Sequence, residues 1–70
     1  MTSKLLVVRK HRIDRGVFEF RMPEAAAEAA SQCRTRGWTP HGEPVLVFDN
    51  PTLTMALVRV SVEEPDGSPD

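Results

Sequence analysis

The sequence predicts a small α+β domain of order ββαββ, in which one helix packs on one face of an antiparallel sheet. Two observations support this fold class. Four short segments are rich in β-branched or other apolar residues, as strands are, and turn-forming residues separate them. One alanine-rich segment, which has strong helix propensity, separates the first two from the last two. The 70 residues suffice for one domain, and their pattern does not define the strand order of the sheet.

The first two predicted strands form a hairpin. Residues 4–11 contain the unbroken apolar run Leu5-Leu6-Val7-Val8, which is typical of a buried strand. The polar residues that follow end at Gly16 and indicate a hairpin connection. Residues 16–22 then alternate between two faces, and the expected core side chains are Phe18, Phe20 and Met22.

The predicted helix extends from Pro23 to Arg36. Proline suits the first helical turn, and Gly37 suits the residue that follows a helix. The best apolar stripe, at spacing i, i+3, i+4, i+7, is Ala26, Ala29, Ala30 and Cys33. The side chains expected to face solvent are Glu28, Ser31, Gln32 and Thr35. Because the stripe is made of small side chains, we expect Trp38 to fill the end of the core.

The last two predicted strands are residues 45–48 and 53–62. A loop rich in proline and glycine precedes them at 39–44, and a turn at 49–52 separates them. One alternation of the longer strand consists of Leu53, Met55, Leu57 and Arg59. The other consists of Ala56, Val58, Val60 and Val62. We expect a single domain at residues 1–62, followed by a disordered acidic C-terminal tail at 63–70.

The strands have more apolar surface than one helix can cover. Three of the four are apolar on both alternations, so a second face of the sheet needs a cover. The residues predicted to form this association face are Val45, Val47, Val58 and Val60. A homodimer is the favoured cover. The alternatives are another protein, a sheet that curls to bury both faces within one chain, and a small apolar ligand beside the helix or at a dimer seam.

Charge is distributed unevenly along the chain. Residues 1–40 carry eight basic and four acidic side chains (+4), whereas residues 41–70 carry one basic and six acidic side chains (−5). The basic side chains concentrate in the first hairpin, where the candidates for nucleic-acid phosphate contacts are Arg9, Lys10, Arg12 and Arg15. The alternative is that these charges keep a hairpin tip in solvent and protect an edge strand.

The residue types needed for catalysis or metal binding are scarce. Cys33 is the only cysteine, and the two histidines, His11 and His41, lie on other predicted elements. We therefore expect no catalytic, cofactor-binding or metal-binding residues and no enzymatic activity. The apolar run at residues 5–8 is too short for a secretion signal or a membrane span, so we expect a cytoplasmic protein with no membrane contact.

Two functional hypotheses follow. The first is a small non-catalytic protein-interaction module, a homodimer that acts as an accessory or regulatory protein. The second is a nucleic-acid-binding regulator that uses the basic first hairpin. A steep loss of nucleic-acid binding with salt distinguishes the second from the first.

Overall fold

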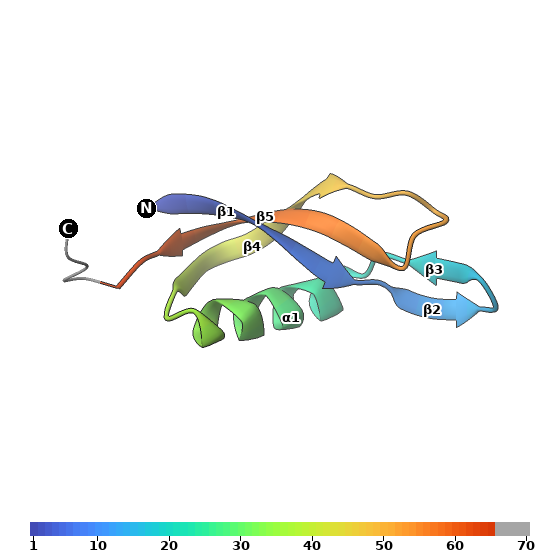
Figure 1. Cartoon of the computed structure of the whole chain (residues 1–70), viewed down its shortest axis with the longest axis horizontal. Helices are drawn as coiled ribbons and strands as arrows, with labels where there is room; N and C mark the ends of the chain where they lie inside the picture. Colours follow the sequence, from blue (N-terminus) through green and yellow to red (C-terminus); the bar gives the residue numbers. More distant parts are fainter. Residues whose placement is uncertain (66–70) are drawn as a thin grey trace.

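The computed structural model describes residues 1–65 and shows a small α+β domain with one helix packed on an antiparallel sheet (Figure 1). The expected fold class is confirmed, with one strand more than predicted. The elements are β1 (Thr2–Arg9), β2 (His11–Asp14), β3 (Val17–Glu19), α1 (Met22–Thr35), β4 (Thr39–Phe48) and β5 (Met55–Glu63). Residues 66–70 of the predicted tail lie outside the described residues, and Glu63 belongs to β5.

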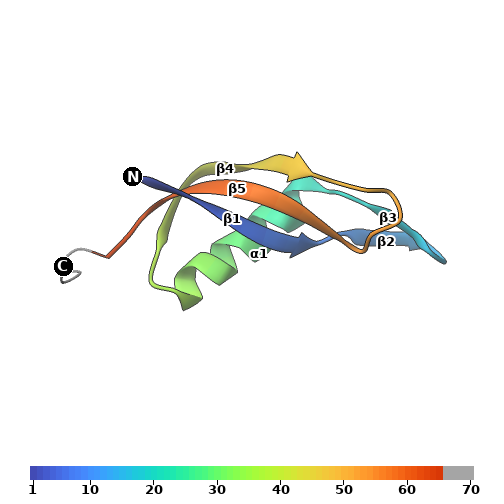
Figure 2. The ribbon, with the colours of Figure 1, turned by 45° about the horizontal axis from the view of Figure 1, so that its top comes forward.

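The strands form two separate antiparallel sheets. The three-stranded sheet has the order β1-β5-β4, so the last strand of the chain lies at its centre. The second sheet is the hairpin β2-β3, which extends beyond the first sheet and gives the molecule its longest dimension of 47 Å (Figures 1 and 2). The hairpin therefore forms an arm that projects from the body of the domain.

The arm differs from the predicted first hairpin because a tight turn pairs its two strands locally. Asp14 pairs with Val17, which leaves only Arg15 and Gly16 in the turn, and Gly16 has a φ of +69°. Glycine adopts this left-handed conformation without steric penalty. The polar segment from His11 onward is therefore a strand rather than a connection, and β3 pairs with β2 instead of β1.

The core lies between α1 and one face of the three-stranded sheet. Its members are Leu6 and Val8 of β1, Ala25, Ala29 and Cys33 of α1, and Ala56, Val58, Val60 and Val62 of β5. Phe20 and Trp38 are partly buried and pack against this cluster, as the sequence predicts for both side chains. All four buried side chains of β5 come from one alternation, and the helix meets them with small residues.

The helix is rotated relative to the prediction. Its buried stripe is Ala25, Ala29 and Cys33, whereas Ala26 and Ala30 are only half-buried. The prediction was thus wrong at two positions of four. This rotation allows two polar side chains of the helix to form hydrogen bonds with the backbone of β1.

Those two side chains are Glu28 and Gln32, which were expected to face solvent. The backbone N–H of Arg9 donates to Glu28 Oε1 at 2.7 Å, and Gln32 Nε2 donates to the carbonyl of Val7 at 2.8 Å. Both bonds satisfy backbone groups of β1, which has β5 as a neighbour on one side only. The helix thereby joins its polar flank to an edge of the sheet.

The end of the helix and the start of β4 are set by two glycines. Gly37 has a φ of +78°, which confirms its predicted position after the helix, and the Trp38 N–H donates to the Cys33 carbonyl at 2.8 Å. Residues 39–44 were predicted to be a loop but belong to β4. A bulge between His41 and Val45 contains Gly42, at a φ of +73°, and accommodates this segment within the sheet.

Among the described residues, no helix has the length and apolar character needed to cross a membrane, since α1 has 14 residues.

Candidate functional site

The face of the three-stranded sheet opposite α1 is apolar and exposed. Residues directly opposite each other on paired strands lie on the same face of a sheet. Val7 of β1 pairs with Leu57 of β5, which pairs with Phe48 of β4, so an apolar row crosses all three strands. We call this surface the open face, and it comprises Leu5, Val7, Val45, Phe48, Met55 and Leu57 together with Arg9 and Arg59.

The exposure of these side chains shows that no described part of the chain covers them. Leu5, Val45 and Phe48 are 60%, 53% and 54% exposed, and Val7 and Met55 are only slightly less exposed. On soluble proteins the largest contiguous apolar patch of the surface often marks an interaction site. The open face is therefore the candidate site of interaction.

The predicted association face is corrected by the structure. Val45 lies on the open face, but Val58 and Val60 are completely buried beneath α1, and Val47 lies at an irregularity of β4 between Leu46 and Phe48. The alternation of β5 that contains Val58 and Val60 is wholly apolar, whereas the other contains Arg59, whose charge requires solvent or a partner. The charged alternation consequently faces outward.

Sequence reasoning placed Met55 and Leu57 on the alternation with Arg59 but did not assign them to the site. The charge of Arg59 was the signal that identifies this alternation as the outward one. Within residues 1–65, Arg59 forms no ion pair. It lies in the central strand, paired with Leu5 on one side and Val45 on the other.

The edges of the sheet are protected against extension by another strand. At β1, the bonds from the helix side chains of Glu28 and Gln32 occupy outward backbone groups. At β4, the edge contains Pro40 and Pro44, which have no N–H to donate, and the strand bulges between His41 and Val45. A partner would thus meet the face of this sheet more readily than its edges.

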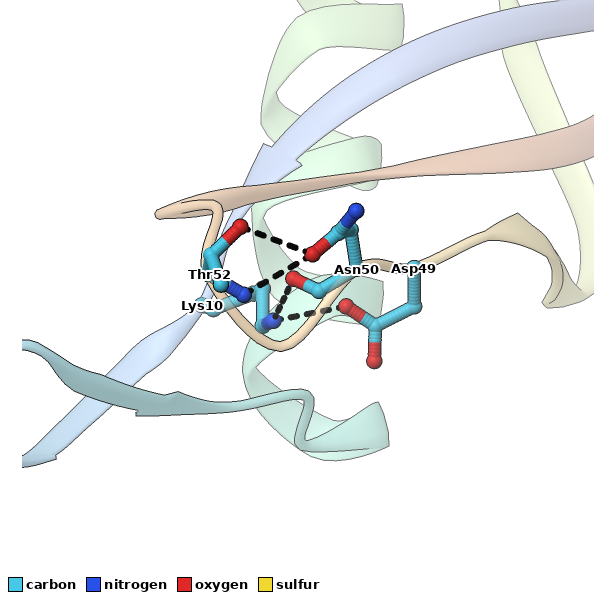
Figure 3. A network of polar contacts seen from close by, with 4 residues as sticks. All are labelled: Lys10, Asp49, Asn50 and Thr52. Atoms are coloured by element: carbon cyan, nitrogen blue, oxygen red, sulfur yellow. Dashed lines mark hydrogen bonds and ion pairs between the residues drawn. The ribbon is translucent and has the colours of Figure 1, made fainter.

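The predicted basic cluster is divided, because Lys10 is buried. Its Nζ lies 2.6 Å from Asp49 Oδ1 and donates to the Asn50 carbonyl at 3.0 Å (Figure 3). The Lys10 side chain is 1% exposed. Lys10 follows Leu6 and Val8 in the inward alternation, which directs its side chain away from solvent and into the turn between β4 and β5. It is not available for phosphate contacts.

The turn that receives Lys10 is itself held by side-chain hydrogen bonds. The N–H and Oγ1 of Thr52 donate to Asn50 Oδ1 at 3.0 and 2.8 Å, and the Lys10 N–H donates to the Thr54 carbonyl at 2.9 Å. We call Lys10, Asp49, Asn50 and Thr52 the hinge network, because Lys10 lies between β1 and the arm. This network connects the base of the arm to the sheet.

The other three members of the predicted cluster are exposed. Arg12 and Arg15 lie on the arm, and Arg9 lies at the end of the open face. Within the described range, none of their guanidinium groups forms an ion pair. The arm also exposes Ile13 and Val17, so its surface is mixed rather than purely basic.

At the opposite end of the sheet, charged groups surround Trp38. The ammonium of Lys4 and the guanidinium of Arg36 lie 4.8 and 5.4 Å from the centre of its ring. Lys4 also lies 3.0 Å from Glu64 Oε2, and its hydrogen bond and positive charge lower the pKa of Glu64. These contacts attach the chain after β5 to the sheet.

The residues that chemistry would require lie apart. Cys33 is buried in the core, His11 pairs with Glu24 at 3.1 Å, and His41 pairs with Glu63 at 3.2 Å. Across residues 1–65, no three His, Cys, Asp or Glu side chains form a group that could hold a metal ion, and no pocket is found.

Comparisons with models of protein families, with curated proteins and with solved structures find no match to this chain.

Proposed function

We propose that this chain is a small non-catalytic protein-interaction module that forms a homodimer through its open face and acts as an accessory or regulatory protein. The observation that carries the proposal is the apolar row Val7, Leu57 and Phe48, which crosses every strand of the sheet on the side without a helix. The protected sheet edges support a contact through the face.

The size of the open face is consistent with a dimer of modest affinity. Five of its apolar side chains are 44–60% exposed. Burying the exposed half of such a side chain contributes about 1 kcal/mol, so ten side chains in two copies contribute about 10 kcal/mol. Association costs about 4–15 kcal/mol in lost freedom and ordering. At the lower end of this cost about 6 kcal/mol remains, which corresponds to a dissociation constant of about 40 µM, and a higher cost gives a weaker dimer.

A pair of matched variants tests this function. Leu57→Glu places a charge at the centre of the open face, and Ala27→Glu places the same charge on the exposed side of α1. In sedimentation equilibrium at about 1 mM, where a weak dimer is still populated, Leu57→Glu is expected to have the 7.8 kDa mass of one chain. Ala27→Glu is expected to dimerise as the unmodified chain does. Equal dimerisation of both folded variants would refute the open face as the interface.

Nucleic-acid binding is the second candidate, favoured by the exposed guanidinium groups of Arg9, Arg12 and Arg15, which form no ion pair within residues 1–65. The burial of Lys10 weakens it. So does the charge of residues 1–65, where nine basic side chains face eight acidic ones, for a net +1. If it is correct, a variant with Arg12→Ala and Arg15→Ala loses the low-salt mobility shift of a DNA or RNA duplex, and Arg34→Ala retains it. Absence of any shift with the unmodified chain would exclude it.

A further inference from the structure

We infer that the two copies meet about a two-fold axis that runs across the strands and passes between Leu57 and Arg59. The strands of the two sheets are then antiparallel across the interface, and each strand lies over its own copy. This inference rests on the proposed homodimer and specifies its arrangement. It follows from the order of apolar and charged rows on the open face.

The open face consists of successive rows, each perpendicular to the strands. One row is Leu5, Arg59 and Val45, and the next is Val7, Leu57 and Phe48. The row beyond the second begins with Arg9 and Met55, and the row before the first is Ser3, Ser61 and His41. The two central rows thus hold five apolar side chains and one arginine. The row on one side of them contains Arg9, and the row on the other side is polar.

A two-fold axis parallel to the strands and centred on β5 would place every row on itself. Arg59 would then face Arg59 of the partner subunit at the centre of the interface, where water is excluded. Two like charges without a carboxylate oppose association strongly in such surroundings. Displacing this axis toward an outer strand separates the arginines but leaves the other outer strand uncovered.

A two-fold axis across the strands exchanges the two central rows instead. Leu5 lies opposite the partner's Val7, and Val45 lies opposite the partner's Phe48, so both outer strands bury apolar side chains against apolar side chains. Arg59 lies over the partner's Leu57, to which it presents its aliphatic stem. Its guanidinium can reach water, because an outer strand is only about 4.8 Å away in a sheet of three strands.

The same axis places the two arms at opposite ends of the dimer. About nine residues separate the axis, near residue 6, from the tip of the arm at Arg15, which corresponds to about 30 Å of extended chain. The dimer is therefore about 60 Å long, twice that distance. An axis parallel to the strands would keep both arms at one end and retain the 47 Å length of a single chain.

Cross-linking of engineered cysteines tests the arrangement, because Cys33 is the only native cysteine and is buried. The variants are Ser61→Cys and Met55→Cys, two exposed positions of the central strand in the rows outside the two central ones. A short bis-maleimide is expected to link these two variants to each other in a mixture and to link neither to itself, because each lies about 20 Å along the strands from its own copy. An axis parallel to the strands would instead place each of them opposite its own copy. Small-angle scattering of the unmodified dimer measures its length independently.

Efficient cross-linking of either variant to itself, or a dimer length near that of one chain, would refute the arrangement while leaving the homodimer intact. A chain that stays monomeric at about 1 mM would refute both the homodimer and its arrangement. Linking in the mixture of Ser61→Cys and Met55→Cys, together with a dimer of about 60 Å, supports the inference. Circular dichroism verifies that each variant remains folded.

Discussion

In the hinge network, we expect substitution of Lys10 and substitution of Asp49 to destabilise the fold by different amounts. Lys10 and Asp49 form one ion pair at 2.6 Å, but the Lys10 side chain is 1% exposed and the Asp49 side chain 29% exposed. Removing the acid leaves a charge that cannot reach water, whereas removing the base leaves a charge that can. Asp49→Asn is therefore expected to destabilise the fold more than Lys10→Met.

The loss of unfolding free energy in each variant follows from the surroundings of the charge that remains. Removing one partner of a fully buried ion pair costs about 3–5 kcal/mol. Solvent near Asp49 and the remaining bond from Lys10 to the Asn50 carbonyl reduce the expected cost of Asp49→Asn to about 2–4 kcal/mol. Lys10→Met keeps the apolar stem and is expected to cost about 0–1.5 kcal/mol. A domain of this size has about 4–10 kcal/mol in total, so the first change is severe.

Urea unfolding followed by circular dichroism measures both variants at one fixed protein concentration, because dimerisation adds to apparent stability. The double variant is expected to lie close to Lys10→Met, since the cost of Asp49→Asn arises from the stranded ammonium. If Lys10→Met proves as destabilising as Asp49→Asn, the reasoning from unequal burial is wrong.

Three further predictions concern the core, the end of the helix and the charged group beside Trp38. Ala29→Leu overfills the close contact between α1 and the sheet and is expected to destabilise by about 1–3 kcal/mol, which a lowered melting temperature would show; Ala27→Leu on the exposed side should not. Gly37→Ala is expected to cost about 1–2 kcal/mol in urea unfolding through its left-handed backbone alone, since the added Cβ would meet only Pro65 Cγ, at an ordinary 3.7 Å. Because Lys4 holds the pKa of Glu64 below its ordinary 4.5, the stability from this pair is present above pH 4.5 and is lost as the pH falls through the lowered pKa. Lys4→Met should return the pKa of Glu64 toward 4.5 in an NMR titration, and an unchanged pKa would contradict the assignment.

The sequence predicts those features of the fold that depend on neighbouring residues. Alternation identified the two faces of β5, and the positions of Pro23 and Gly37 located the helix to within a residue at each end. The strand β2 was missed because its residues are polar, and it forms only through the tight turn at Gly16. The rotation of α1 was missed because it depends on Glu28 and Gln32 reaching β1, a contact between segments far apart in the chain.

The same distinction applies to the candidate site. The excess of apolar strand surface was visible in the sequence, and Arg59 marked which alternation of β5 faces outward, although that signal was not used. The burial of Lys10 could not be predicted from the sequence. Its partner Asp49 lies in a turn that follows both α1 and β4 along the chain, far from Lys10 in sequence. Contacts of this range are set by packing and leave no local pattern.

Sedimentation equilibrium of the unmodified chain, from about 10 µM to about 1 mM at low and high salt, tests the central claim most directly. The proposal predicts a reversible monomer–dimer equilibrium whose dissociation constant changes little with salt, because the interface is mainly apolar. A folded chain that remains at 7.8 kDa over the whole range would contradict the claim that a second copy covers the open face.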